Sequence, residues 1–176
     1  MKEILREKFL DKLKTSNLEN SRVEALNFKL IDYLHEKEYE NIMAFYPKSF
    51  EVQINKTLID ILQSKNQQLF LPRVNGQNLD AYKISDLESD LVNGSFGLME
   101  PKLSLEKVSK EFIDCVICPG ICFDKNGYRI GFGKGFYDRF LKDFQGQKIG
   151  VCYSEFLIED CFPIEFDIKM DHLIYL

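Results

Sequence analysis

The chain has 176 residues, of which 45% are hydrophobic and 29% are charged, and its formal net charge is −5. A chain of this length and composition buries enough apolar surface for one compact domain, which excludes intrinsic disorder as its main state. The acidic balance argues against a basic nucleic-acid binder. The longest uncharged stretches, 91–99 and 115–123, fall well short of the ~20 apolar residues that cross a membrane.

The N-terminus and the cysteines favour a reduced, cytoplasmic protein. The first 14 residues are charged throughout and contain no apolar segment of a secretory signal. Five cysteines are an odd number, which we interpret as reduced thiols. Cys115 and Cys118 form a C-x-x-C pair in an apolar strand, where residues three apart face opposite sides, so we expect core cysteines rather than a metal or redox site. His35 and His172 have no ligand-forming neighbour at metal-binding spacing.

The first forty residues predict two amphipathic helices. Apolar residues recur at helical spacing in a stripe that begins at Ile4 and ends at Leu13. A longer stripe covers 23–34, and Asn20 or Ser21 is a suitable N-cap for the helix that carries it.

After residue 40 the pattern changes to short apolar runs separated by turn residues. We expect strands at 42–46, 69–71, 80–84, 115–118, 148–153 and 172–176, the first two ended by Pro47 and Pro72. Helices are expected around 58–62 and 137–144, and a loop at 91–101.

Strands that alternate with helices predict an α/β fold. We expect a single domain over residues 1–176, with a mostly parallel sheet, helices on both faces and a Rossmann-like three-layer architecture. Ligands of such sheets bind outside the carboxyl ends of the strands. The loops after Tyr46, Leu71 and Cys118 are therefore the places where a site is expected.

Charge is distributed unevenly near the C-terminus. Residues 155–171 hold six acids and one base, whereas residues 124–143 hold five bases and three acids. The pattern fits a polyanion held together with its metal ion, and it equally fits two solvated surfaces.

A glycine-rich segment carries the chemistry. Gly131, Gly133 and Gly135 alternate, which lets the backbone approach a ligand and expose successive N–H groups. Arg129 and Lys134 add full positive charges, so the segment predicts an anion cradle, with phosphate as the commonest occupant. The segment matches neither the Walker A loop nor the dinucleotide fingerprint. Three alternating glycines by themselves fit a structural turn equally well.

The run from Pro119-Gly120 to Asp138 resembles the signature of the 5-formyltetrahydrofolate cyclo-ligase family. The resemblance extends in order over nearly the whole chain, at a length typical of the family. Further matching blocks are the K-x-x-L-R opening at Lys2–Arg6, Tyr46–Val52, Leu71–Val74, Glu100-Pro101 and the tail Pro163–Asp171, which resembles the D-x-x-x-D ending of the family.

The resemblance implies a ligase that converts 5-formyltetrahydrofolate to 5,10-methenyltetrahydrofolate with ATP as co-substrate and Mg²⁺ as metal. A formamide oxygen is a poor leaving group, but its phosphorylation gives an iminium phosphate that N10 of the same folate can attack. Phosphate then leaves and the ring closes. Such an enzyme positions two substrates and neutralises phosphate charge, and it needs no protein nucleophile.

The resemblance also implies a nucleotide site. Lys2 and Arg6 stand four residues apart on one helical face and are expected to reach one polyphosphate, although a solvated face is the alternative. Lys134 and Arg129 are expected to act in catalysis. The whole ATP-binding segment would comprise Arg129, Ile130, Gly131, Phe132, Gly133, Lys134, Gly135, Phe136 and Tyr137.

Carboxylates complete the expected site. Asp138 and Asp167 match the metal positions of the family and are hard oxygen ligands suited to Mg²⁺. Their alternatives are a helix-start acid and a surface acid. Glu51 would bind the folate pterin, or else begin a helix. Tyr46 lies at a matching folate-side position, where a packing tyrosine is the alternative, and Arg73 would contact phosphate or the folate glutamate tail.

Two departures from the family pattern stand in the glycine loop. Phe132 occupies a position that is often Arg or Gly, and Phe136 replaces a frequent Tyr. One rival interpretation is a reduced-folate-binding protein without turnover, and another is a sugar-phosphate isomerase or acyl-transfer enzyme on a similar sheet. Small-molecule substrates, no nucleic-acid or membrane partner, and a cytoplasmic monomer are expected.

Overall fold

The computed structural model describes all residues, 1–176. The helices are α1 (Lys2–Thr15), α2 (Asn20–Glu36), α3 (Asn55–Gln63) and α4 (Phe136–Leu141), with 3-10 turns at Ser95–Gly97, Lys110–Phe112 and Ser154–Phe156. The strands are β1 (Asn41–Met43), β2 (Gln68–Asn75), β3 (Asn78–Ile84), β4 (Leu91–Asn93), β5 (Met99–Pro101), β6 (Lys107–Val108), β7 (Cys115–Cys118), β8 (Cys122–Asp124), β9 (Arg129–Ile130), β10 (Gln147–Cys152), β11 (Leu157–Ile158) and β12 (His172–Tyr175).

A seven-stranded sheet with the order β12-β10-β7-β1-β2-β3-β6 forms the centre of the molecule. The pairs from β12 to β2 are parallel, and β3 and β6 add antiparallel strands at one edge. The four residues of β7 are all buried, as expected for a parallel strand covered on both faces. The predicted α/β class with a mostly parallel sheet is confirmed.

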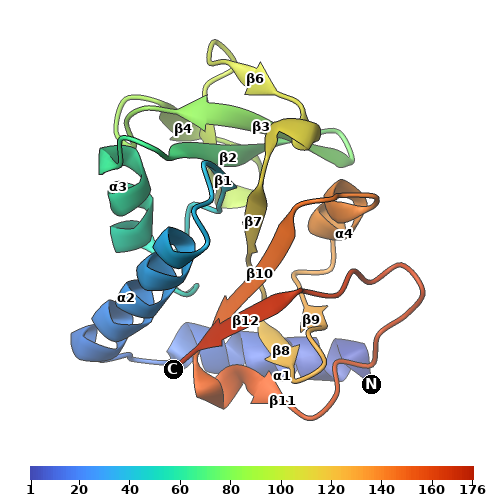
Figure 1. Cartoon of the computed structure of the whole chain (residues 1–176). Helices are drawn as coiled ribbons and strands as arrows, with labels where there is room; N and C mark the ends of the chain where they lie inside the picture. Colours follow the sequence, from blue (N-terminus) through green and yellow to red (C-terminus); the bar gives the residue numbers. More distant parts are fainter.

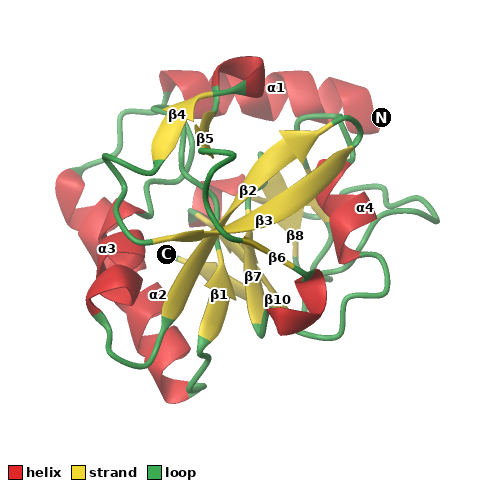
Figure 2. Ribbon diagram, turned by 90° about the horizontal axis from the view of Figure 1, so that it is seen from above, coloured by secondary structure: helices red, strands yellow, loops and turns green.

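Helices cover the sheet on both sides. Figures 1 and 2 show α2 and α3 together on one side and α4 on the other, while α1 lies across one end beside the small sheet β11-β8-β9. A cluster of 37 buried apolar residues fills the space between these layers. Asn27 of α2 ties the helical layer together, because its amide oxygen accepts bonds from the backbone N–H and the hydroxyl of Thr57.

The strand order reverses between β1 and β7. From β1 the chain passes through α3 to β2 on one side, whereas β7 leads towards β10 and β12 on the other. Such a switch point leaves a crevice at the carboxyl ends of the two strands, where ligands of open α/β sheets bind. The segments that leave it begin at Ala44 and Pro119.

Both predicted N-terminal helices are present, with two differences in detail. Ile4 is 65% exposed, so the buried stripe of α1 runs through Leu5, Phe9 and Leu13 instead. The N-cap of α2 is Glu19, which makes no side-chain cap bond, rather than Asn20 or Ser21. No helix of the chain is long and apolar enough to span a membrane.

Two expectations about strands were wrong. Strand β2 continues through Pro72 to Asn75, because β1 pairs only as far as Phe70 and leaves β2 a free edge where a missing N–H is tolerated. The segment 91–101 is a hairpin of β4 and β5 rather than a loop, and its turn contains both glycines of the segment.

Candidate active site

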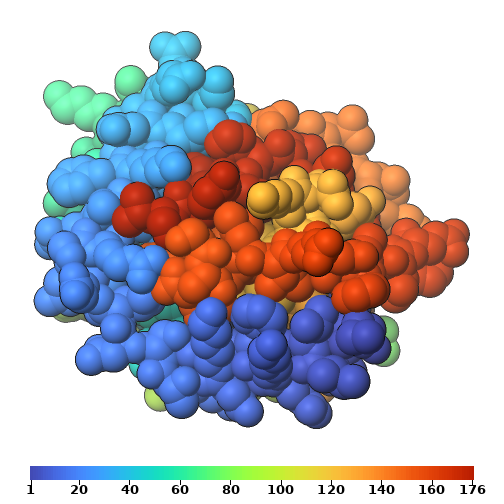
Figure 3. Space-filling view, turned by 90° about the horizontal axis from the view of Figure 1, so that it is seen from below, coloured from blue at the N-terminus to red at the C-terminus, as the bar shows by residue number.

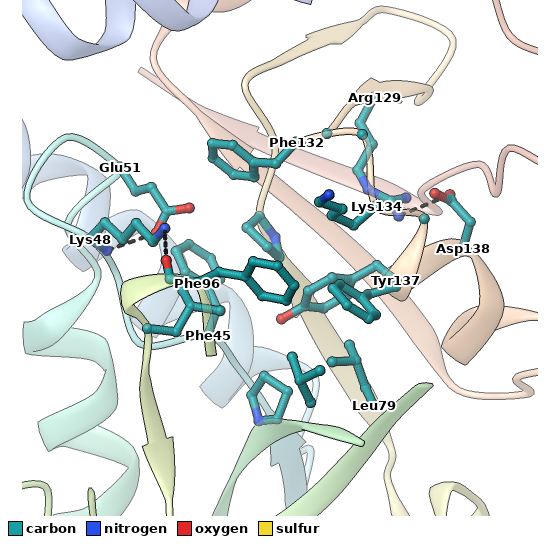
Figure 4. A pocket seen from close by; sticks show the side chains of 18 of the residues that line it. Phe45, Lys48, Glu51, Leu79, Phe96, Arg129, Phe132, Lys134, Tyr137 and Asp138 are labelled. Carbon is teal, nitrogen blue, oxygen red and sulfur yellow. Dashed lines mark hydrogen bonds and ion pairs between the residues drawn. The ribbon is translucent and has the colours of Figure 1, made fainter. Parts of the chain in front are cut away.

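A cavity of about 340 Å³ opens at the switch point of the sheet. Its wall combines the segment after β1, the strand β2, the hairpin β4–β5, the loop 131–135 and the N-terminus of α1. Figure 4 shows the side chains that face it. Of the predicted site residues, those that line the cavity are Lys2, Arg6, Tyr46, Glu51, Arg129, Gly131, Phe132, Gly133, Lys134, Gly135, Phe136, Tyr137, Asp138 and Asp167.

The glycine loop between β9 and α4 forms the cationic wall. Gly133 and Gly135 have positive φ angles of 86° and 65°, which glycine adopts at no steric cost. Gly131 has no positive φ, and a Cβ added there would meet no atom within 4 Å. Its Cα therefore faces open cavity, where a ligand can approach the backbone closely. Lys134 points into the cavity and has no carboxylate partner, so its charge is available to an anion.

Helix α1 brings two more cations to the same wall. Arg6 donates from Nε to the carbonyl oxygen of Gly131 at 2.9 Å, which fixes the glycine loop to the helix. Lys2, one turn earlier, forms an ion pair with Asp167 of the C-terminal segment. Figure 3, seen from below, shows α1 in blue directly beside the C-terminal segments in orange and red. The i, i+4 spacing thus brings both cations to one cavity.

Asp138 and Asp167 line the cavity beside these cations. Asp138 accepts bonds on Oδ1 from Arg129 at 2.9 Å and from the N–H of Ile168 at 3.2 Å. Asp167 uses Oδ2 for Lys2 and for the N–H of Ile164. In each carboxylate the other oxygen makes no hydrogen bond, and no cluster of three or more metal-ligating side chains occurs in the chain. Two such oxygens fit Mg²⁺ that is shared with phosphate and water.

Glu51 occupies the opposite wall, in the segment after β1. Its Oε2 accepts a bond from the backbone N–H of Lys48 at 2.7 Å. Burial raises the pKa of the Glu51 carboxyl, and the bond from Lys48 opposes that rise in part. The first helix after it begins at Asn55, so the alternative of a helix-start acid is wrong. A half-buried carboxylate with a raised pKa in a cavity is a candidate for ligand recognition.

Tyr137 carries an unsatisfied hydroxyl next to the cavity. The oxygen is buried and has no hydrogen-bond partner, and burial raises the pKa of the phenol well above its ordinary value. The guanidinium of Arg129 lies 6.0 Å from the centre of the Tyr137 ring. A buried hydroxyl without a partner is costly unless a ligand or water supplies the bond.

Two predicted site residues do not line the cavity. Ile130 is fully buried in β9, where it pairs with Cys122. Arg73 of β2 does not line the cavity; its NH1 donates to the carbonyl of Pro101 at 2.6 Å and lies 3.8 Å from Oε2 of Glu100. Glu100 itself is 2% exposed and forms part of the cavity wall.

The thiols and histidines lie outside the site. All five cysteines are buried and free. Burial raises the pKa of Cys118 and Cys152 to about 12, so neither thiol is a nucleophile at neutral pH. His172 stacks on Tyr33 with ring centres 4.4 Å apart, and burial lowers its pKa.

Sequence reasoning missed several cavity residues on other elements. They are Phe45, Lys48, Leu79, Phe96, Glu100 and Ile164, among others. Lys48 stands in the same short block as Tyr46 and Glu51, so that block contained a signal for it. Ile164 stands in the matched C-terminal block, three residues before Asp167, whereas Phe96 lies between matched blocks and is brought in only by the fold.

The switch point of the parallel sheet opens on a cavity that is lined by a cationic glycine loop. This arrangement is typical of α/β proteins that bind an anionic small molecule. The model of the 5-formyltetrahydrofolate cyclo-ligase family matches residues 1–176. The chain therefore belongs to this family of ligase enzymes, as the sequence blocks predicted.

Known relatives cover nearly the whole chain. It is 31% identical to the 5-formyltetrahydrofolate cyclo-ligase of Mycoplasma pneumoniae over 178 residues, which is 98% of this chain and 97% of that protein. An NMR structure of Aquifex aeolicus 5,10-methenyltetrahydrofolate synthetase matches with 35% identity and a TM-score of 0.81, covering 99% of this chain and 89% of that one. A synthetase structure from Mycoplasma pneumoniae shares the fold, with a TM-score of 0.80 at 24% identity over 98% and 97% of the two chains.

Proposed function

We propose that the protein uses ATP to close 5-formyltetrahydrofolate to 5,10-methenyltetrahydrofolate, with release of ADP and phosphate. The supporting observation is that the cationic wall and the opposite wall, which carries Glu51, face one cavity. The cations Lys2, Arg6 and Lys134 belong to the first wall, and Glu51 belongs to the second. A single cavity lets the terminal phosphate meet the formyl oxygen without a covalent enzyme intermediate.

The triphosphate of ATP would lie along the glycine loop. Lys134 neutralises charge on the transferred phosphoryl group, and the open side of Gly131 admits the phosphates to the backbone. Lys2 and Arg6 hold the rest of the polyphosphate. Arg129 is 6% exposed and already paired with Asp138, so it acts by fixing this carboxylate as well as by adding charge.

Asp138 and Asp167 would hold Mg²⁺ through the carboxylate oxygens that make no protein hydrogen bond. Mg²⁺ held there would supply positive charge to stabilise the phosphoryl group during its transfer. A Lys2 side chain freed from Asp167 would then be available to the phosphates. The two carboxylates are too few to bind the ion tightly by themselves, so we expect it to enter with the nucleotide.

The folate would bind with its pterin near Glu51 and Tyr46. The formyl oxygen attacks the terminal phosphorus and ADP leaves, which converts the formamide into an iminium phosphate. N10 then attacks the iminium carbon, phosphate departs, and N10 loses its proton as the methenyl bridge forms. The unpaired hydroxyl of Tyr137 is buried beside the cavity, where it is placed to donate a hydrogen bond to a bound substrate.

The two rival functions fit the cavity less well. A folate-sequestering protein needs no cationic loop, yet Lys134 is held in the cavity without a counterion. A sugar-phosphate isomerase needs a carboxylate poised to take a proton. It has no use for Lys2 and Arg6 of α1 in addition to the cations of the glycine loop.

The remaining expectations concern the state of the protein. We propose that residues 1–176 act as one domain, which is supported by the single buried apolar cluster that spans both termini. Five free, buried thiols support a reducing compartment such as the cytoplasm. We propose a monomer, since every group assigned to the cavity comes from one chain.

The test is turnover of 5-formyltetrahydrofolate with Mg²⁺ and ATP, followed by the near-ultraviolet absorbance of the methenyl product. We expect product only when ATP is present, with one ADP released per product. Saturable folate binding without product would indicate the sequestering protein. Product formation that does not depend on ATP would contradict the proposal, as would the absence of both turnover and folate binding.

A further inference from the structure

The tip of the β4–β5 hairpin, residues 94–97, contacts both walls of the cavity. The carbonyl oxygen of Phe96 accepts a hydrogen bond from Nζ of Lys48 at 2.8 Å. The ring of the same residue lies 5.6 Å from Nζ of Lys134 and 6.0 Å from the ring of Phe136. Figure 4 shows Phe96 between the segment that carries Glu51 and the loop that carries Lys134.

These contacts form a continuous chain across the cavity. The backbone N–H of Lys48 binds the carboxylate of Glu51, and the side chain of Lys48 binds Phe96. The ring of Phe96 then faces Lys134, whose charge attracts the electron-rich face of an aromatic ring. Phe96 therefore connects Glu51, which we propose binds folate, with Lys134, which we propose binds phosphate.

The hairpin tip is held in an unusual backbone conformation. Phe96 has φ 58° and ψ 24°, a left-handed conformation that is unfavourable for a residue with a side chain. Such conformations persist only where the surroundings impose them, and they gather at functional sites.

Buried anchors fix the hairpin tip to the sheet. Glu100 accepts a bond from the N–H of Val74 in β2 at 3.2 Å, and its side chain packs so closely on Gly94 that a Cβ there has no room. The N–H of Gly94 binds the carbonyl of Leu98 at 2.8 Å. These contacts anchor the base of the tip, whereas the side chain of Phe96 at its end is 57% exposed.

We propose that Phe96 is a positioning residue that couples the binding of the two substrates. Lys48 and Lys134 both contact Phe96, so a ligand that orders one of these lysines also orders the exposed Phe96 side chain that the other lysine contacts. The second ligand then binds to groups that are already ordered, which makes it bind more tightly. The inference rests on the proposed function, since it takes a nucleotide and a folate as the two ligands.

The test measures binding, so it does not depend on turnover. Isothermal titration calorimetry gives the Kd of 5-formyltetrahydrofolate alone and in saturating Mg²⁺ with a β,γ-imido analogue of ATP. We expect the nucleotide to tighten folate binding about 10-fold in the unaltered protein. In Phe96→Ala this enhancement falls to about 2-fold or less, while the Kd of each ligand alone changes by no more than about 3-fold.

Three further variants separate the ring from the fold. Phe96→Tyr keeps an aromatic face and should restore the enhancement. Phe96→Gly removes the ring but suits the left-handed backbone, so it should fold well and still lack the enhancement. Phe28→Ala is the matched control, because Phe28 is 62% exposed against 57% for Phe96 and has Nζ of Lys56 at 6.0 Å from its ring, yet lies outside the cavity.

The possible failures are distinct. An enhancement that persists in Phe96→Ala and Phe96→Gly would overturn the inference, and so would its absence from the unaltered protein that binds each ligand alone. A large loss of folate affinity in Phe96→Ala with the enhancement intact would make Phe96 a direct substrate contact instead. Failure of the unaltered protein to bind nucleotide or folate at all would overturn the proposed function, and the inference with it.

Discussion

The two walls of the cavity are built in different ways. The cationic wall consists largely of one continuous segment, residues 129–138, to which α1 adds Lys2 and Arg6. The opposite wall collects single residues from the segment after β1, from β2 and β3, and from the β4–β5 hairpin. The cationic wall is rich in charged side chains, whereas the opposite wall is mainly apolar, with Glu51 and Glu100 as its carboxylates.

This difference teaches how each wall holds its ligand. A polyphosphate needs charge and backbone N–H groups at close spacing, which a short glycine-rich loop supplies locally. A flat, largely apolar ring system needs a shaped surface, which only several packed elements can provide. Substitutions in the first wall should therefore act on catalysis and nucleotide binding, and those in the second on folate affinity and on stability.

The largest effect is expected from Lys134→Ala. Removing a preorganised cation from the transferring phosphoryl group should lower kcat/KM for ATP about 10²–10³-fold. Folate affinity, measured by titration without nucleotide, should stay nearly unchanged, because Lys134 belongs to the cationic wall. Lys142→Ala, an exposed lysine outside the cavity, is the control. Equal loss of nucleotide and folate binding would remove Lys134 from its phosphate role.

Glu51→Gln should have opposite effects on function and stability. Loss of a charged hydrogen-bond acceptor should raise the KM for folate about 10–100-fold and leave the KM for ATP unchanged.

The stability effect follows from the raised pKa of Glu51. Burial raises the pKa of the Glu51 carboxyl above 4.5 in the folded state, so the folded state binds the carboxyl proton more tightly than the unfolded state does. The free energy of unfolding therefore falls as pH rises from 4.5 through the raised pKa. Glu51→Gln should therefore raise Tm at pH 7, and the gain should vanish below about pH 4.5. A variant less stable than the parent at pH 7 in a calorimetric scan would argue against a desolvated carboxylate.

Asp167→Asn should weaken the binding of Mg²⁺ at the cationic wall. The concentration of Mg²⁺ for half-maximal turnover should rise about 10-fold, because one of the two carboxylates proposed to hold the ion is lost. The ion pair with Lys2 is partly buried, so its loss should also lower stability, by about 1–3 kcal/mol. Glu165→Gln, an exposed acid two residues away, should leave the Mg²⁺ dependence unchanged. An unaltered dependence in Asp167→Asn would place the ion elsewhere.

The smallest effects are expected from two glycines of the same loop. Gly133→Ala forces a side chain into a positive φ of 86° and should lower Tm by roughly 2–8 °C. Gly131→Ala should leave Tm unchanged, because neither its φ nor its surroundings require glycine, yet it should raise the KM for ATP. Thermal melts and initial rates of both variants check the pair. Unchanged ATP kinetics in Gly131→Ala would mean that no ligand approaches that Cα.

The sequence predicts the contiguous half of the cavity far better than the dispersed half. The segment 129–138 has its glycines, cations and aspartate within ten residues, so spacing alone brings them to one place. Phe96 and Ile164 reach the cavity only because the hairpin and the C-terminal segment fold back over the sheet.

Arg73 illustrates why a local pattern is insufficient. Its position after a strand proline suggested a loop that faces a ligand. Strand β2 instead continues through Pro72, and the guanidinium of Arg73 is held on β5 by the carbonyl of Pro101, outside the cavity. The burial of Glu100 in the opposite wall was also not predictable from a local pattern. It depends on the pairing between β4 and β5, which short-range signals did not reveal.

The most direct test of the account follows the oxygen atom of the formyl group. The protein is supplied with ATP, Mg²⁺ and 5-formyltetrahydrofolate that carries ¹⁸O in the formyl group, and the released phosphate is examined by mass spectrometry. If the formyl oxygen attacks the terminal phosphorus inside one cavity, each phosphate released carries one ¹⁸O atom. Unlabelled phosphate, with the ¹⁸O found in water or retained in the folate, would contradict the transfer of a phosphoryl group to the formyl oxygen.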